Sequence, residues 1–199
     1  DYIKHEGNLL FVGCSTTSGK LLTYTRNNDI ANLEVLAKLP GNLGGLVKMN
    51  AGLKSWEMFN YINSIKTKDG YIKKEDVNFS YRETKIDTII YEVVFNIESG
   101  FCKEKLKEFN KMRDNQPHVP SAGSCFKNPK DDFAGRLIEA VELKGLRQGD
   151  MSFSEQHANF LVNNGAGTFE DAIYLIDLAK KKIKEEFSID IEEEIIIYK

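Results

Sequence analysis

Apolar residues recur with two different periods in the first half of the chain. Short apolar runs predict strands at residues 8–12 and 20–25, separated by a turn-rich stretch at 13–19. Residues 29–38 instead carry apolar side chains at helical spacing. The clearest strand is predicted over residues 87–97, which are rich in β-branched and aromatic side chains. The first half is therefore predicted to mix helix and sheet.

The second half alternates charged helices with shorter segments. Residues 102–112 predict a charged helix, and the polar residues 113–118 after it are the best candidate for a domain boundary. A helix is predicted over 134–143, and a longer one is predicted from a capping-box pattern at Thr168 to about Phe187. The alternating residues 189–197 predict a closing strand. We expect an α+β protein with parts 1–112 and 113–188, in which the closing strand (189–199) rejoins the first part.

Composition narrows the class of protein. The chain has 199 residues and a net charge of −3, which gives a nucleic-acid partner no electrostatic support. No apolar run is long enough to cross a membrane, and no signal peptide opens the chain. Three scattered cysteines and three scattered histidines predict no disulfide framework and no metal site. A monomer in the cytoplasm is expected.

The run Ser121-Ala-Gly-Ser-Cys-Phe-Lys-Asn-Pro129 is the most informative local pattern. Pro120 and Pro129 fix φ on either side, which predicts a shaped loop rather than a helix or a central strand. Ser124 stands between small neighbours, so its hydroxyl is a candidate to face a ligand. An ordinary turn remains the alternative interpretation.

Three other segments carry candidate chemistry. The glycine-dense stretch 40–52 can expose backbone N–H groups to a phosphate, although glycine-rich turns are more often structural. Arg82 precedes the long predicted strand and can pair with a carboxylate or simply lie at the surface. Three consecutive acids, Glu192 to Glu194, indicate either a solvated edge strand or a carboxylate directed into a pocket.

Together these motifs resemble UDP-N-acetylenolpyruvoylglucosamine reductases, the flavoenzymes of bacterial cell-wall synthesis. The resemblance spans roughly residues 33–197 and keeps the order of the family's motifs. Those motifs are Pro40-Gly-Asn-Leu-Gly-Gly, Met49-Asn-Ala-Gly52, Ser80-Tyr-Arg82, Gly123-Ser-Cys-Phe-Lys-Asn-Pro129, Ala134-Gly-Arg-Leu-Ile-Glu139, Leu143-Lys-Gly-Leu-Arg147 and Ser154-Glu-Gln-His-Ala-Asn-Phe-Leu-Val-Asn163.

The resemblance implies an NADPH- and FAD-dependent reduction of UDP-N-acetylglucosamine enolpyruvate to UDP-N-acetylmuramate. It implies that Ser124 donates a proton and that Arg82 and Glu194 stabilise the enolic intermediate. Residues 1–112 would form part of an FAD-binding domain and 113–188 the substrate-binding domain. The implied cofactor-binding residues are Pro40, Gly41, Asn42, Gly44, Gly45, Asn50, Ala51 and Gly52. The implied substrate-binding residues are Lys127, Asn128, His157 and Arg147, with a packed structural histidine as the alternative for His157.

The sequence departs from the family pattern at three places. The family's additional N-terminal domain is absent, so we expect this chain, which starts at Asp1, to be the later part of a longer polypeptide. The short stretch Leu53-Lys-Ser-Trp56 replaces a longer turn, and Glu193 stands where proline is common. Glu193 therefore remains an alternative to Glu194 as the catalytic acid. The other functions that the residues allow are a non-catalytic UDP-sugar-binding fragment and a different flavin oxidase of the same fold.

Overall fold

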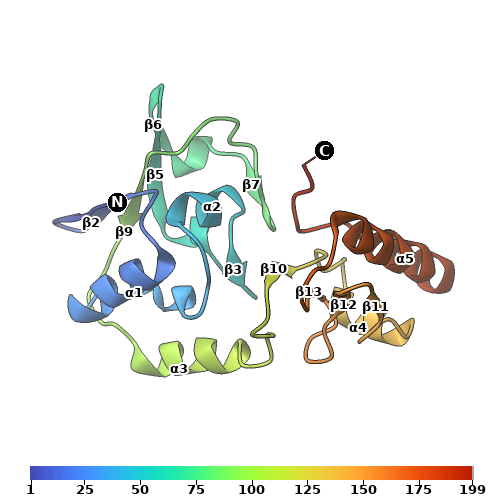
Figure 1. The fold of residues 1–199 in the computed structure, drawn as a ribbon. Coiled ribbons are helices and arrows are strands. Elements are labelled where there is room, and N and C mark those ends of the chain that lie inside the picture. The colour runs from blue at the N-terminus through green and yellow to red at the C-terminus, as the bar shows by residue number, and fades with distance from the viewer. Residues whose placement is uncertain (199) are drawn as a thin grey trace. The chain divides into compact units, whose positions relative to one another are not determined.

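A computed structural model describes residues 1–198 and shows helices combined with antiparallel sheets (Figure 1). The chain divides into two compact units, Asp1–Asp114 and Asn115 onward. Each unit buries its own apolar cluster. The predicted mixture of helix and sheet is confirmed, and the division falls within the polar stretch 113–118.

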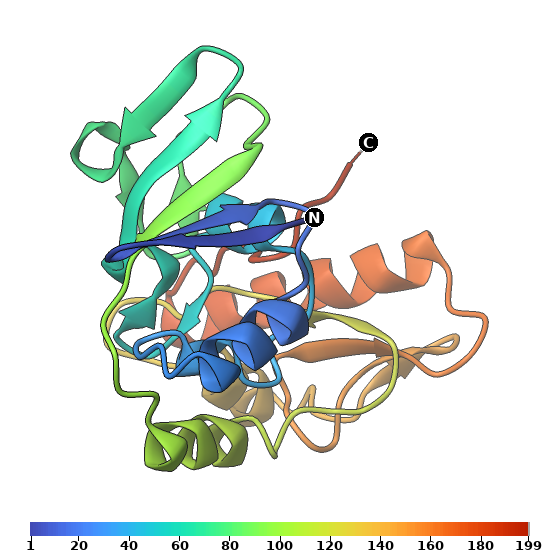
Figure 2. The ribbon, with the colours of Figure 1, turned by 90° about the vertical axis from the view of Figure 1, so that its left-hand side faces the viewer.

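The first unit is built on a five-stranded antiparallel sheet in the order β1-β2-β9-β5-β6 (Figure 2). The central strand β9 is buried along most of its length, since it has a neighbour on each side. The bounds of the strands are β1 Ile3–Glu6, β2 Leu9–Gly13, β5 Ile62–Thr67, β6 Gly70–Lys73 and β9 Glu92–Asn96. The strand predicted at 8–12 is confirmed, and the one predicted over 87–97 is shortened to β9.

Helices α1 (Ser18–Asn27) and α2 (Leu43–Lys48) share their apolar cluster with this sheet, and α3 (Lys103–Met112) confirms the predicted charged helix. Short connecting elements complete the first unit. They are the 3₁₀ turns η1 Glu34–Leu36, η2 Met58–Asn60 and η3 Lys74–Asp76, the hairpin of β3 Gly52–Leu53 with β4 Trp56–Glu57, and the hairpin of β7 Phe79–Ser80 with β8 Glu83–Thr84.

The strand predicted over 20–25 is wrong, because these residues lie in helix α1. The Thr17 hydroxyl caps that helix by accepting the Lys20 N–H at 3.3 Å. Burial of Leu21 and Thr25, four residues apart, follows a helical period despite the β-branched composition. Capping and packing together outweigh the local strand preference.

The helix predicted over 29–38 is also wrong, since only η1 forms there. Asp29, Asn32 and Lys38 have φ values of 53°, 74° and 54°, and such left-handed residues interrupt a helix. The apolar residues of this segment are buried in the first unit without a helical backbone.

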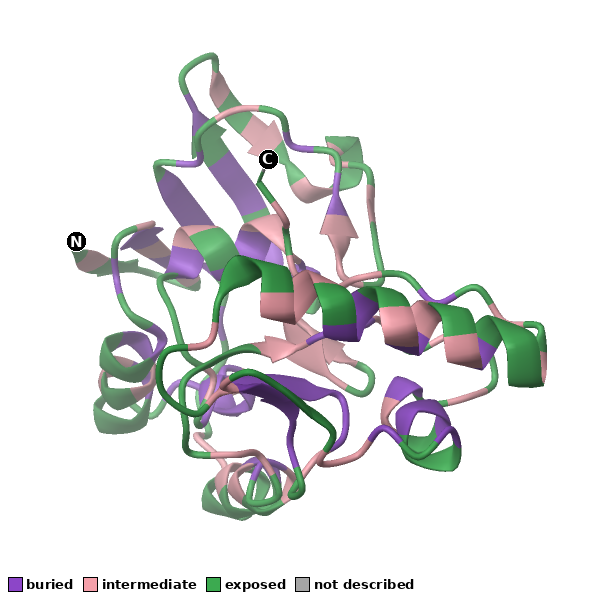
Figure 3. Ribbon diagram, turned by 45° about the vertical axis from the view of Figure 1, so that its right-hand side comes forward, coloured by how far each residue is buried: buried purple, intermediate pink, exposed green. Residues whose placement is uncertain are grey.

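The second unit has a four-stranded antiparallel sheet in the order β10-β13-β12-β11. Helices α4 and α5 supply much of its apolar cluster, and Figure 3 shows buried residues recurring along α5 while its other side is exposed. The bounds are β10 Ser121–Ser124, α4 Ala134–Ala140, β11 Arg147–Gln148, β12 Met151–Phe153, β13 Phe160–Asn163 and α5 Phe169–Phe187. Ser121–Ser124 is thus an edge strand rather than a loop.

The predicted closing strand is wrong. Residues 189–197 form only an isolated bridge between Phe126 and Glu193, and they belong to the second unit rather than rejoining the first. Ser188 has φ 58° at the end of α5, and Ile191 is buried in the second core. Packing of Ile191 therefore fixes the route of the chain end.

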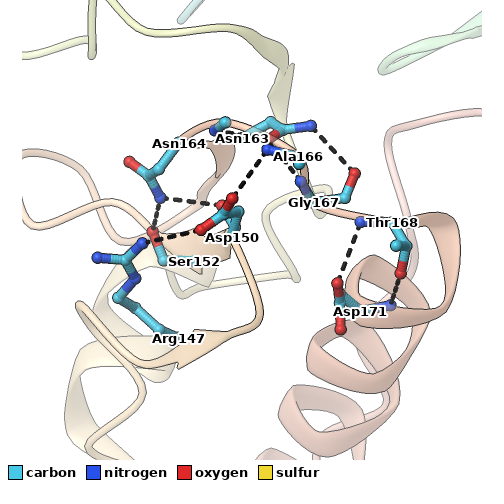
Figure 4. Close-up of polar contacts among 10 residues, drawn as sticks. Arg147, Asp150, Ser152, Asn163, Asn164, Ala166, Gly167, Thr168 and Asp171 are labelled. Carbon is cyan, nitrogen blue, oxygen red and sulfur yellow. Dashed lines mark hydrogen bonds and ion pairs between the residues drawn. The ribbon is translucent and has the colours of Figure 1, made fainter.

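The predicted capping box at the start of α5 is confirmed (Figure 4). The Asp171 N–H donates to the Thr168 hydroxyl and the Thr168 N–H donates to the Asp171 carboxylate, each at 3.1 Å. These bonds satisfy backbone groups that the first turn of a helix otherwise leaves unpaired.

We predict that Thr168→Ala lowers the free energy of unfolding by about 1 kcal/mol, because it removes one half of this box. Urea denaturation followed by circular dichroism measures the change. The control is Thr23→Ala on the exposed side of α1, where the hydroxyl donates only to the Gly19 carbonyl of its own helix. Equal losses for the two variants would contradict a capping role for Thr168.

Candidate functional site

Ser124 lies at the end of edge strand β10, where the strand is irregular. Ser121 pairs with Val162 and Ser124 pairs with Phe160, and the register shifts between the two pairs. Gly123 has φ 88°, a left-handed value that a residue with a Cβ rarely adopts. Such irregularities bend a strand and redirect its side chains. Ser124 is half-buried at this bend.

The residues after Ser124 are paired with the C-terminal segment. The Glu194 N–H donates to the Cys125 carbonyl at 2.8 Å, and the Lys127 N–H donates to the Glu192 carbonyl at 2.8 Å. These two bonds surround the bridge between Phe126 and Glu193. The structure therefore brings two of the predicted catalytic residues, Ser124 and Glu194, onto adjoining strands of backbone.

Asn159 fixes the same segment from its other side. Its carbonyl accepts the Cys125 N–H at 2.6 Å, and its side-chain amide bonds to both the N–H and the C=O of Phe126 at 3.0 and 2.8 Å. Asn159 is only 4% exposed. The motifs do not predict this role for Asn159; the signal in the sequence is an amide side chain beside the apolar run 160–162.

Glu193 and Glu194 have different surroundings. The Lys180 ammonium on α5 lies 2.8 Å from a Glu193 carboxylate oxygen. Burial acts to raise the pKa of Glu193, but its hydrogen bonds and the Lys180 charge outweigh burial, and the pKa is lowered. The Glu193 carboxylate is thus paired with helix α5, and the assignment of Glu194 rather than Glu193 as the catalytic acid stays a prediction.

Two of the predicted substrate-binding residues follow directly after Phe126. The Lys127 ammonium lies 3.3 Å from the Glu192 carboxylate, and three-quarters of the Lys127 side chain is covered. The Asn128 side-chain oxygen accepts the Ala134 N–H at 3.0 Å, at the first residue of α4. Asn128 is exposed, so its position is fixed by the helix while its surface remains accessible.

His157 is held by its own loop. Its Nδ1 atom accepts the Asn159 N–H at 3.3 Å, and its ring packs edge-on against Phe160 with centroids 4.9 Å apart. Burial, with a smaller contribution from the Lys144 charge, lowers the pKa of His157. The contacts support the packed structural interpretation, with a neutral imidazole at neutral pH.

Arg147 lies at the opposite edge of the sheet from Ser124. It is on β11, three strand spacings from β10, which corresponds to about 14 Å. Its guanidinium is 3.5 Å from Asp150, whose carboxylate accepts the Ala166 N–H at 2.8 Å (Figure 4). The structure therefore does not place Arg147 on the Ser124 strand or beside it in the sheet.

Arg82 occupies the turn between β7 and β8 in the first unit. Its guanidinium donates to the Gly52 carbonyl at 2.9 Å and to the Asn50 carbonyl at 3.4 Å, and it lies 3.6 Å from the Glu57 carboxylate. Only 12% of the Arg82 side chain is exposed. Its position is therefore fixed by the end of the glycine-rich segment.

Asn50 connects this segment to the arginine hairpin from the inside. Its amide group donates to Glu57 at 2.8 Å and to the Ser80 carbonyl at 3.0 Å, and its side-chain oxygen accepts the Phe59 N–H at 3.1 Å. Asn50 is fully buried. Its side chain therefore supports the segment from inside the unit, and the implied role of Asn50 in cofactor binding stays a prediction.

The glycine-rich stretch forms helix α2 rather than an open loop. The N–H groups of Leu43 and Gly44 donate to the carbonyls of Thr16 and Cys14 at 2.9 and 3.0 Å. A Cβ at Gly52 would lie 2.1 Å from the Trp56 carbonyl, so this position requires glycine for close approach. The half-buried Ala51 donates its N–H to Leu46 at 2.8 Å, inside the unit.

Only four residues of the glycine-rich stretch 40–52 are exposed, and two of them are glycines. They are Pro40, Gly41, Asn42 and Gly45. A Cβ at Gly45 would meet nothing within 4 Å, so the backbone there is open to a flat or phosphate-bearing ligand. A cofactor could approach the main chain at this surface. The exposed residues are fewer than the residues of this stretch that the resemblance implies for cofactor binding.

No other ligand site stands out in the part of the chain that the structure describes. It holds no cluster of His, Cys, Asp and Glu suited to a metal ion, and none of its helices is long and apolar enough to cross a membrane. Two grooves of about 520 and 660 Å³ in the first unit are lined by residues such as Lys20 and Lys68. None of the predicted site residues lines either groove.

Comparison with known proteins agrees with the resemblance. Residues 115–198 match the family described as UDP-N-acetylenolpyruvoylglucosamine reductase, C-terminal domain. The protein of that name from Helicobacter hepaticus is 46% identical over 196 residues, which cover 98% of this chain and 74% of the relative. The one from Campylobacter jejuni (strain RM1221) is 47% identical over 188 residues, covering 94% and 73%.

The fold also matches a solved structure. The crystal structure of UDP-N-acetylenolpyruvylglucosamine reductase from Thermus caldophilus superposes with a TM-score of 0.85 at 31% sequence identity. The match covers 95% of this chain and 72% of that one.

We predict that Lys180→Met raises the pKa of Glu193, because it removes the charge that favours the carboxylate. The pKa of Glu193 is lower in the folded protein than in the unfolded one, so the ionised carboxylate stabilises the fold at pH values above its unfolded-state pKa. This stabilisation is lost as pH falls through the folded-state pKa. The loss of stability caused by Lys180→Met should therefore shrink in acid. Carboxyl-detected NMR titration measures the pKa, with Lys181→Met as control, since Lys181 pairs with Glu185. An unchanged titration in Lys180→Met would contradict the assignment.

Proposed function

This chain belongs to the UDP-N-acetylenolpyruvoylglucosamine reductase family, and we propose that it carries out the NADPH- and FAD-dependent reduction of UDP-N-acetylglucosamine enolpyruvate to UDP-N-acetylmuramate in peptidoglycan precursor synthesis. Two relatives that carry this enzyme name are 46% and 47% identical to the chain. The observation that supports the proposal most directly is the backbone pairing that joins the Ser124 strand to Glu194.

We assign the first unit to flavin binding. Pro40, Gly41, Asn42 and Gly45 would meet the cofactor at the exposed backbone, while Gly44, Asn50, Ala51 and Gly52 shape the segment from within. When bound, FAD would supply the hydride chemistry, with NADPH as the hydride source and the enolpyruvyl double bond as the acceptor. The chain contributes placement of the cofactor and the electrostatics around it.

Ser124 is the proposed proton donor. Hydride addition to the terminal carbon of the enolpyruvyl group leaves negative charge on the carbon next to the carboxylate, and that carbon must then receive a proton. A serine hydroxyl is a weak acid, so it needs fixed neighbours that favour proton transfer. The bend at Gly123 and the backbone hydrogen bonds of Cys125 with Asn159 and Glu194 hold the Ser124 backbone in place.

Arg82 and Glu194 are the proposed stabilisers of the enolic intermediate. The guanidinium supplies positive charge, and a protonated or hydrogen-bonded glutamate supplies polarisation. Arg82 is held by the Asn50 and Gly52 carbonyls, and Glu194 is held by its N–H bond to Cys125. Charges fixed in this way need no reorganisation during the reaction.

We assign substrate binding to the second unit. Lys127 follows Ser124 by three residues and carries a largely covered cation, and Asn128 presents an exposed side chain at the start of α4. A lysine and an amide are suited to a nucleotide-sugar that carries a diphosphate and a carboxylate. His157 and Arg147 remain assigned to the substrate as proposals, although neither lies within the Ser124 pairing.

The intact protein is expected to purify with FAD and to oxidise NADPH only when the enolpyruvyl substrate is added. Absorbance at 340 nm follows NADPH, and mass spectrometry identifies the product. A full-length protein that never takes up FAD would overturn the proposed function. Binding of UDP-N-acetylglucosamine without flavin, unchanged in Ser124→Ala, would indicate a non-catalytic sugar-binding protein instead.

Ser124→Ala is expected to slow reduction of the enolpyruvyl substrate by about 100-fold or more, because a positioned general acid typically contributes that much. Reduction of the flavin by NADPH should change little, since the serine takes no part in it. Stopped-flow measurement separates the two half-reactions. Ser121→Ala, on the same strand but exposed, is the matched control. Equal losses in both half-reactions would refute the donor role.

A further inference from the structure

Asn159 is a buried amide to which the proposed chemistry gives no role. It lies directly before β13 and is 4% exposed. Its side-chain oxygen accepts the Phe126 N–H at 3.0 Å, and its side-chain nitrogen donates to the Phe126 carbonyl at 2.8 Å. Phe126 is itself fully buried, so one side chain satisfies both of its backbone polar groups away from water.

The Asn159 amide takes the place of a neighbouring strand where the chain changes its pairing. Up to Ser124, strand β10 is paired with β13. Residues 125–127 then pair along their other edge with residues 192–194. The N–H and carbonyl of Phe126 point to the edge opposite that pairing, because backbone groups alternate in direction along an extended strand. Asn159 bonds to both groups directly after Ser124, at the point where the neighbours change.

Only a side chain with a donor and an acceptor can make both bonds. An amide has the two side by side, an ionised aspartate has acceptors but no donor, and leucine has neither. The backbone of Asn159 is also fixed, since its carbonyl accepts the Cys125 N–H at 2.6 Å and its N–H donates to Nδ1 of His157 at 3.3 Å. The His157 loop therefore orients Asn159, and Asn159 orients the chain that follows Ser124.

We propose that Asn159 is a positioning residue for the protonation step, and that it fixes the place of the Ser124 hydroxyl through the backbone of residues 125–126. The inference rests on the proposed function. In that step one proton moves from the Ser124 oxygen to the carbon beside the substrate carboxylate, and water returns a proton to the serine. A displacement of about 1 Å between donor and acceptor can slow such a step about 100-fold. Reduction of the flavin by NADPH does not involve Ser124 and is independent of Asn159.

The test measures the two half-reactions by stopped flow in the intact wild-type protein and in Asn159→Leu and Asn163→Leu. Asn163 on β13 is the matched control, because its side-chain oxygen accepts the N–H groups of Gly165 and Gly167 in its own loop. We expect Asn159→Leu to slow reduction of the enolpyruvyl substrate about 100-fold. Its reduction by NADPH, and both half-reactions of Asn163→Leu, should stay close to the wild type.

A double-mutant cycle shows whether Asn159 acts through Ser124. If it does, Asn159→Leu combined with Ser124→Ala is no slower than Ser124→Ala alone, because the donor that Asn159 positions is already gone. Losses that multiply in the double variant would overturn the proposed role.

Asn159→Asp adds a pH profile. The ionised carboxylate cannot donate to the Phe126 carbonyl, whereas the protonated acid can. The rate of the enolpyruvyl half-reaction, divided by the wild-type rate at the same pH, should therefore be low at neutral pH and rise as pH falls. The titratable and charged side chains around this segment are common to both proteins, so this ratio removes their contributions. They are Cys125, Lys127, His157, Glu192, Glu193 and Glu194.

The outcomes separate the role of Asn159 from the proposed function. If the intact wild-type protein neither takes up FAD nor reduces the substrate, the proposed function fails and the role of Asn159 fails with it. If the wild type is active but Asn159→Leu keeps its rate, or loses equally in both half-reactions, only the role of Asn159 fails. Should Asn159→Leu not fold, the Asn159→Asp profile decides: a rate ratio that rises toward low pH supports the role, and a flat one overturns it.

Discussion

The pairing of residues 125–127 with residues 192–194 is the interaction on which the candidate site of the second unit depends. Two backbone hydrogen bonds of 2.8 Å join segments that are about 65 residues apart in the chain. Asn159 holds residues 125–126 from the other side through its backbone and its amide. Because this stretch is fixed from both sides, the Ser124 backbone just before it has little freedom, and Glu194 is kept beside the same strand.

In the first unit, a buried network of polar side chains holds the candidate residues. Asn50, Glu57 and Arg82 form a polar network inside the unit. The Asn50 side chain bonds to the Glu57 carboxylate, to the 3₁₀ turn at Phe59 and to the arginine hairpin at Ser80. A buried network of this kind is rigid when its members are paired, because any displacement leaves a polar group unsatisfied. The segment assigned to the cofactor thus rests on residues that need not touch a ligand themselves.

The backbone pairing in the second unit and the polar network in the first both hold the proposed catalytic residues in fixed positions. Ser124, Arg82 and Glu194 are ordinary side chains whose reactivity depends on what surrounds them and on how firmly they are held. Two neighbouring acids illustrate how surroundings differ along the chain. The Glu193 carboxylate forms an ion pair with Lys180, and the Glu194 backbone N–H donates to the Cys125 carbonyl.

The sequence by itself determined the features whose causes are local. The capping box of Thr168 with Asp171 and the charged helix α3 depend on neighbours a few residues away, and the chain carries those signals directly. The order of the motifs likewise determined the family. Only the tertiary structure decided that residues 20–25 are helical, that residues 189–197 pair with the Ser124 segment, and that Arg147 lies at the far edge of the sheet. The physical reason is that these outcomes depend on burial and hydrogen bonds between residues far apart in the chain, which no local pattern encodes.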